Sequence, residues 1–180
     1  MKDPEKPKKV EFFSLDKKYI LAYWVTMTSY VVFFLIQLVT VGYSYNASLE
    51  NPWIRRIGLV VSVSGLLMWY IGRKKLGPES VDIDPLGEIS RRILFPSYKK
   101  VHIKKPLVTD GIYAFMKHPQ YWGTVMFYIG FAVAIPSYPA LAFAILVVLP
   151  VHIWRAKVEE EMNLRIFGEK YRRYSEEKRW

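Results

Sequence analysis

Apolar side chains in this chain are gathered into long uncharged runs, and the charged residues lie between those runs. The first run covers residues 19–49 and contains no charged side chain. Its core, residues 19–42, exceeds the roughly 20 helical residues that cross about 30 Å of hydrocarbon. It is too long for a signal peptide and lacks a small-residue cleavage site. We therefore expect a membrane-spanning helix here.

A second, shorter uncharged run covers residues 57–72. Arg55 and Arg56 precede it, three basic residues follow it, and aromatic residues lie near both ends. On its own such a run also fits a buried helix of a soluble protein. Flanking basic side chains that can extend to the membrane surface, together with interfacial aromatic rings, favour a second span.

The third run, residues 119–154, is too long for one straight span. Pro136 and Pro139 interrupt it, and two closely spaced prolines mark a turn between helices. We expect a helical hairpin with arms at 121–135 and 140–154, each short enough to tilt or thin the bilayer. The predicted fold is an all-α integral-membrane bundle of about four transmembrane helices, including this Pro-broken helical hairpin.

The distribution of charge predicts how these spans are oriented. The chain has 26 Lys and Arg against 16 Asp and Glu, and 24 of the 26 basic residues lie in residues 1–18, 73–118 and 155–180. By the positive-inside rule these segments are cytoplasmic. The chain is then a single multi-pass membrane domain over residues 1–180. Its parts are a cytoplasmic tail (1–18), two spans (19–72), a cytoplasmic loop (73–118), the hairpin (119–154) and a cytoplasmic C-terminal helix (155–180).

Composition excludes several classes of protein. An apolar content of 52% excludes disorder, and the absence of cysteine excludes a disulfide scaffold, a zinc ribbon, an iron–sulfur cluster and a cysteine nucleophile. The basic residues are scattered along segments next to the membrane and accompany no nucleic-acid-binding motif. We expect no nucleic acid and no metal, and a lipid bilayer with anionic headgroups as the partner.

The first polar cluster lies just before the hairpin and at its start. Residues 109–111 (Thr-Asp-Gly) have turn composition, and Pro119 suits the first turn of a helix, so His118 lies at the start of the third span. A helix start carries unpaired N–H groups and suits a carboxylate ligand. The same residues also fit a simple capping turn with two interfacial aromatics, Tyr113 and Tyr121.

The second polar cluster continues the last span without a helix breaker before Gly168. Arg155 and Glu159 are four residues apart and share one face of this helix. They could form an ordinary exposed ion pair. Because both lie within about one turn of the membrane surface, a functional role is the favoured interpretation.

Two stretches carry a resemblance to a known family: GIYAFMKHPQYWG at residues 111–123 and RAKVEEEMNLRIFGEKYRRY at residues 155–174. In this order and separation they resemble the isoprenylcysteine carboxyl methyltransferase family and are similar to the wider group that includes the phospholipid N-methyltransferases. The resembling region spans residues 105–174. The chain departs from the family in having Lys117 where an arginine is usual, and in its short N-terminal half.

The resemblance implies an S-adenosylmethionine site on the cytoplasmic side. Arg155 would face a lipophilic acceptor, most simply the carboxylate of an isoprenylcysteine-like substrate. Residues of the loop, the third span and the last helix would hold the cofactor, namely Lys105, Pro106, Leu107, Val108, Tyr113, His118, Pro119, Gln120, Tyr121 and Glu159.

Physical chemistry agrees with this assignment. In-line methyl transfer from a sulfonium needs alignment and exclusion of water more than acid–base catalysis. Glu159 suits the cofactor's positive charge, Arg155 suits an anionic acceptor, and aromatic rings attract a sulfonium. A soluble Rossmann methyltransferase is excluded because no Gly-rich strand–turn–helix is present. Four alternatives stay open: N-methylation of a phospholipid or another amine, S-methylation of a thiol, an NADPH-dependent reductase of the sterol-reductase kind, and a non-catalytic membrane scaffold.

Overall fold

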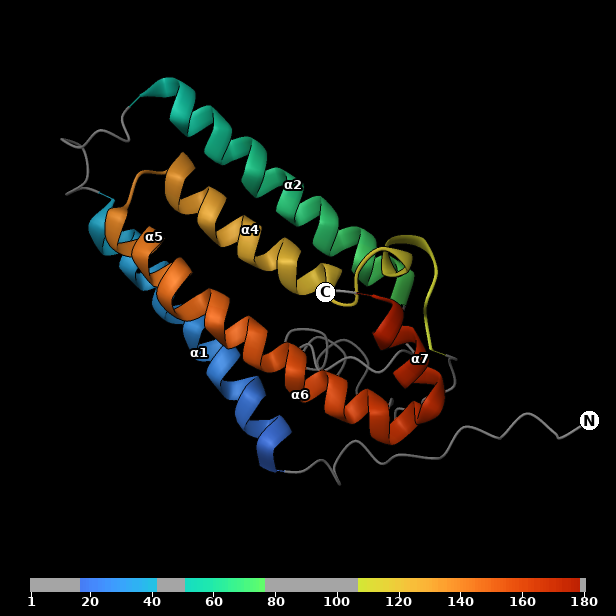
Figure 1. The fold of residues 1–180 in the computed structure, drawn as a ribbon. Helices are drawn as coiled ribbons and strands as arrows, with labels where there is room; N and C mark the ends of the chain where they lie inside the picture. The colour runs from blue at the N-terminus through green and yellow to red at the C-terminus, as the bar shows by residue number, and fades with distance from the viewer. Residues whose placement is uncertain (1–16, 42–50, 77–106, 179–180) are drawn as a thin grey trace, which may run out of the picture.

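The computed structural model describes residues 17–41, 51–76 and 107–178, and all regular structure in those ranges is helical. The long helices run roughly along one common direction (Figure 1). They are α1 (Lys17–Thr40), α2 (Pro52–Leu76), α4 (Pro119–Ala134) and a returning arm of α5 (Tyr138–Phe143), η5 (Ala144–Val148) and α6 (Leu149–Phe167). The short η4 (Gly111–Ala114) precedes α4, and α7 (Glu169–Glu177) follows α6. The all-helical prediction is confirmed.

Three of these helices are long and apolar enough to cross a bilayer, over Leu21–Thr40, Pro52–Leu76 and Tyr138–Phe167. The fourth apolar helix, α4, has only 16 residues and is about 24 Å long at 1.5 Å per residue. It lies beside α2 along its length (Figure 1). The chain is therefore a membrane protein, with α4 as the short arm of the predicted hairpin.

The hairpin turn is held by the end of α1. Ser137 caps α5 by accepting a hydrogen bond from the Ala140 N–H at 3.1 Å, and its hydroxyl lies 2.6 Å from that of Thr40. The Gln37 side-chain amide donates to the Ile135 carbonyl at 2.7 Å. These contacts satisfy polar groups that the apolar surroundings would otherwise leave unpaired.

Helices α2 and α4 approach so closely that their backbones touch. A Cβ atom added to Gly130 would lie 2.4 Å from the Ser62 nitrogen and 2.6 Å from the Gly58 carbonyl oxygen. Gly65 and Gly123 face each other in the same way one to two turns farther along. Small residues allow this close packing between membrane helices, where packing rather than water exclusion drives association.

A cluster of buried residues joins α1 to the hairpin. The rings of Phe33 and Tyr128 meet edge to face with centroids 4.5 Å apart, and small residues of α4, α5 and η5 pack around them. Large apolar side chains on α1 and α2 remain exposed, among them Leu38 and Val60. Such exposed surface suits contact with lipid.

The returning arm contains a π-helical turn, η5, just before Pro150. Proline inside a helix removes one backbone hydrogen bond and clashes with the carbonyl four residues earlier. In membrane helices, local π turns help to give the backbone groups freed by a proline new hydrogen-bond partners. The arm therefore continues into α6 and carries its charged residues beyond the apolar part.

Candidate active site

The two polar clusters come together at one end of the bundle, where α2 ends, α4 begins and α6 passes (Figure 1). The loop before η4 is attached to α2 by an ion pair between Lys75 and Asp110 at 2.5 Å. The hydrogen bond from Lys75 lowers the pKa of the Asp110 carboxyl. Gly111 adopts a φ of +63°, as expected for the predicted turn.

Tyr113 is buried at the centre of this loop. Its hydroxyl donates to the Gly72 carbonyl at 3.4 Å and accepts from the Gln120 side-chain amide at 3.2 Å. The hydroxyl of Tyr174 in α7 donates to the Tyr113 carbonyl at 2.8 Å. Burial raises the pKa of Tyr113 well above its usual value and that of Tyr174 to about 12.

His118 precedes α4 as its N-cap residue, with Pro119 at the first helical position, as predicted. The His118 ring stacks on that of Tyr121 with centroids 5.4 Å apart and planes 2° from parallel. Because a carboxylate only accepts, His118 donates from Nε2 to Glu160 at 3.2 Å. Lys117 contacts the same carboxylate at 2.7 Å, a single-point contact in place of a two-point arginine contact.

Tyr121 connects Glu159 and Arg155. Its hydroxyl donates to Glu159 Oε2, and the guanidinium carbon of Arg155 lies 4.7 Å from the centre of its ring. Arg155 is only 2% exposed, although arginine is rarely fully buried. The structure thus brings a carboxylate and a guanidinium to one aromatic side chain, with Arg155 one turn nearer the apolar part of the helix.

Three successive glutamates contact different sets of partners. Glu159 meets Tyr121, Glu160 meets Lys117 and His118, and Glu161 pairs with Lys18 of α1 at 2.6 Å on the surface. Sequence reasoning gave no role to Glu160. The unusual run of three acidic residues beside one basic cluster was the available signal.

A small pocket lies among these residues, and five of the predicted cofactor-binding residues line it together with Leu76 and Lys117. Its volume of about 10 Å³ is near the minimum for one water molecule. The lining residues therefore pack against one another, and a ligand of cofactor size must displace some of them. The predicted residues that line it are Tyr113, His118, Gln120, Tyr121 and Glu159.

The other predicted residues lie outside this lining. Pro119 is fully buried at the start of α4, and Leu107 and Val108 are half-buried in the preceding loop. Lys105 and Pro106 fall outside the residues that the structure describes. The lining nevertheless fits the chemistry of a sulfonium-bearing amino acid, because it offers a carboxylate and aromatic rings.

Sequence reasoning also missed a buried polar pair beside the site. His152 must donate from Nδ1 to the Val148 carbonyl at 2.8 Å, so its Nε2 accepts from the Tyr30 hydroxyl, also at 2.8 Å. The His152 ring meets that of Tyr121 at a centroid distance of 5.8 Å. A lone histidine inside an uncharged run was the signal, but its partner lies 122 residues away.

Residues 94–170 match a family model described as phospholipid methyltransferase. The matched region contains α4, the returning arm and every lining residue of the pocket except Leu76. No curated protein and no solved structure gives a significant match to the chain. The match confirms the resemblance to the wider phospholipid and isoprenylcysteine group, and it indicates a membrane methyltransferase.

Proposed function

We propose that this chain, whose residues 94–170 match the phospholipid methyltransferase model, is an S-adenosylmethionine-dependent integral-membrane enzyme with a lipophilic methyl acceptor. The observation that carries the proposal is the arrangement around Tyr121. Glu159 and Arg155 both contact this side chain at the end of an apolar helix. A cation binder and an anion binder therefore lie side by side where a lipid-borne substrate would arrive.

The donor side of the site is assigned to Glu159 and the stacked rings of His118 and Tyr121. When bound, S-adenosylmethionine supplies an activated methyl group for in-line transfer. The Glu159 carboxylate would bind the ammonium or ribose of the cofactor through charge-assisted hydrogen bonds. The aromatic rings would attract its sulfonium by about 1 kcal/mol. Tyr113 and Gln120 would close the site and exclude water.

The acceptor side is assigned to Arg155. The proposal is supported by the position of Arg155, which is buried one turn nearer the apolar part of α6 than Glu159. A planar guanidinium suits a carboxylate, since the two can form parallel hydrogen bonds. We therefore propose carboxyl O-methylation of an isoprenylcysteine-like substrate, with the carboxylate oxygen as the nucleophile and Arg155 as the group that positions it.

A second acceptor class is favoured by the family description. In a phospholipid the anion bound by Arg155 would be the headgroup phosphate, and the methyl group would go to the headgroup amine. With either acceptor Arg155 would bind an anionic group, and the two acceptors differ in the atom that is methylated. The chemical stability of the methylated product therefore separates them.

Both termini and the active site are proposed to face the cytoplasm. The support is the clustering of 24 of 26 Lys and Arg in residues 1–18, 73–118 and 155–180. The described pocket residues lie at the end of the bundle where α2 ends in Arg73, Lys74 and Lys75. Basic residues would then also attract the anionic headgroups of that leaflet.

Calorimetric titration of the purified chain in neutral detergent tests the proposed cofactor. S-adenosylhomocysteine should bind with a stoichiometry of one, and NADPH should give no binding heat. NADPH binding without S-adenosylhomocysteine binding would identify a reductase. Absence of both would leave a non-catalytic scaffold and refute the proposal.

A further inference from the structure

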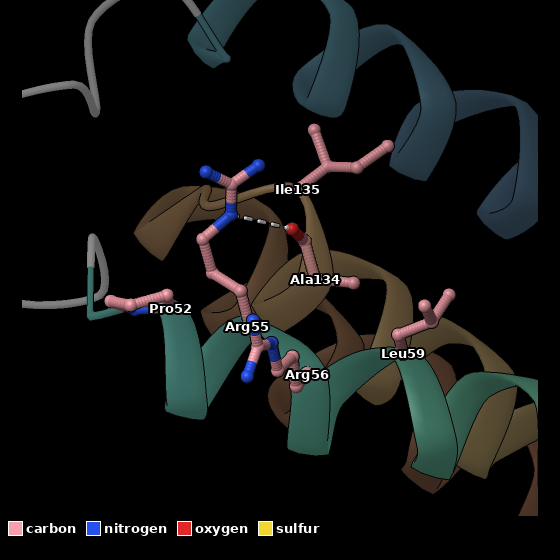
Figure 2. Close-up of a pocket in the computed structure, with 6 residues that line it drawn as sticks. All are labelled: Pro52, Arg55, Arg56, Leu59, Ala134 and Ile135. Carbon is pink, nitrogen blue, oxygen red and sulfur yellow. Dashed lines mark hydrogen bonds between the residues drawn. The ribbon is translucent and has the colours of Figure 1, made fainter.

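A second pocket lies at the opposite end of the bundle, between the start of α2 and the end of α4 (Figure 2). Its volume of about 330 Å³ is within the roughly 300–1,000 Å³ of small-molecule sites. Neither the resemblance nor the proposed function assigns it a role. Its lining consists of Pro52, Arg55, Arg56, Leu59, Ala134 and Ile135.

Two guanidinium groups make this pocket positively charged. Arg55 extends from α2 toward the end of α4, where its Nε donates to the Ala134 carbonyl at 3.2 Å (Figure 2). The guanidinium carbon of Arg56 lies 4.7 Å from the centre of the Trp53 ring. Among the described residues, no carboxylate pairs with either arginine. The pocket therefore carries two positive charges held by uncharged groups.

These contacts orient the charges without neutralising them. The bond to Ala134 engages Nε of Arg55, and the terminal nitrogens carry the other donors of that guanidinium. The N-terminal end of α2, which begins at Pro52, adds a partial positive charge on the same side. An oxyanion with several acceptor oxygens matches this arrangement, because arginine binds phosphate through two parallel hydrogen bonds.

The surroundings indicate that the anion belongs to a lipid. Trp53 is 67% exposed beside the pocket, as is typical of aromatic residues at a membrane–water interface. From Leu59, exposed apolar side chains continue along α2, including Val60 and Val63. A ligand with a phosphate at the pocket and acyl chains along this surface would satisfy both features.

We propose that this pocket binds the phosphate diester of a phospholipid in the leaflet opposite the candidate active site. Arg55 and Arg56 are the two basic residues of the chain that lie outside the three basic segments. Under the proposed topology they meet the headgroups of the other leaflet. The bound lipid would bridge the ends of α2 and α4, whose close packing continues to the active-site end at Gly72.

Native mass spectrometry of the full chain in neutral detergent tests this site. The probes are phosphatidylglycerol, a diacylglycerol with the same acyl chains, and free glycerol phosphate. We expect one phosphatidylglycerol to remain bound, while diacylglycerol and glycerol phosphate bind at least about tenfold more weakly. If diacylglycerol bound as tightly as phosphatidylglycerol, the phosphate would contribute nothing to binding and the proposal would be refuted. Equal binding of glycerol phosphate would show a soluble-anion site and overturn the lipid assignment.

Variants locate the binding. Arg56→Gln removes one guanidinium and leaves the Arg55–Ala134 bond intact, so it should weaken phosphatidylglycerol binding by about tenfold, the effect of one lost charge-assisted contact. Arg56→Lys should recover part of this loss. The control is Arg173→Gln, an exposed residue of α7 at the other end. An equal loss in the control would mean general electrostatic attraction and would refute a specific pocket.

Discussion

The three successive glutamates of α6 offer an internal test of the donor side of the site. Glu159→Gln replaces the carboxylate by an amide that can still accept the hydrogen bond from Tyr121, so the change removes charge with little loss of local structure. Loss of a charge-assisted hydrogen bond to the cofactor costs about 1.5–3 kcal/mol. We therefore expect the Kd for S-adenosylhomocysteine to rise roughly 10- to 150-fold.

The neighbouring glutamates serve as matched controls. Glu161 is about half exposed and pairs with Lys18, and such surface pairs contribute about 0–1 kcal/mol, so Glu161→Gln should leave the Kd unchanged. Glu160→Gln should give a smaller loss than Glu159→Gln, because Glu160 acts only by holding His118 and Lys117. Calorimetry on all three variants gives the ranking. Equal losses at positions 159 and 161 would refute the assignment of Glu159.

Three further predictions concern packing, the acceptor and topology. Gly130→Ala should lower the free energy of unfolding by about 1–3 kcal/mol, because the added methyl group overlaps the α2 backbone. Ser64→Ala, on the exposed side of α2, should leave it unchanged. Thermal unfolding in detergent measures both variants, and equal stability of the two would contradict the close packing of α2 and α4. Arg155→Ala should reduce kcat/KM for the acceptor far more than it reduces the affinity for the cofactor, and Arg155→Lys should recover only part of the lost kcat/KM. Full activity in the lysine variant would show that Arg155 is only a membrane anchor. The chain contains no cysteine, so single cysteines can report the topology. A cysteine in place of the exposed Tyr138 should react with a membrane-impermeant reagent in intact cells, and one in place of the exposed Lys170 should react only after permeabilisation. The reverse pattern would show that the topology is inverted.

The spans and the hairpin could be predicted because their signals are local. An uncharged run reports membrane-spanning length directly, and Pro136 and Pro139 mark the turn wherever the chain packs. Arg155 and Glu159 could be placed together because four residues along a helix return to the same face. Neither inference needs to know which helices are neighbours.

The contacts around the site could not be predicted because they depend on which helices pack together. Tyr121 lies between Arg155 and Glu159 only because α4 packs beside α6, and His118 reaches Glu160 across 42 residues of sequence. The pairing of Tyr30 with His152 depends on the neighbourhood of α1 and α6. A pattern along one helix does not identify such partners.

The close approach of α2 and α4 is an intermediate case. Gly58, Gly65 and Gly72 recur every seven residues, which is a visible pattern along one helix face. The pattern does not identify the opposing helix. In the structure that helix is α4, and Gly123 and Gly130 complete the contact.

Transfer of a labelled methyl group tests the central claim most directly. The purified chain would be incubated with methyl-labelled S-adenosylmethionine and membrane extract, alongside the Glu159→Gln variant, and label would be counted in the organic phase. We predict label in the lipid fraction with wild type and a strong reduction with the variant. Label that base releases as volatile methanol would identify a carboxyl ester, and label that stays in a non-volatile product would identify a methylated amine or a thioether. No transfer above the level of extract alone, together with no binding of S-adenosylhomocysteine, would contradict the account.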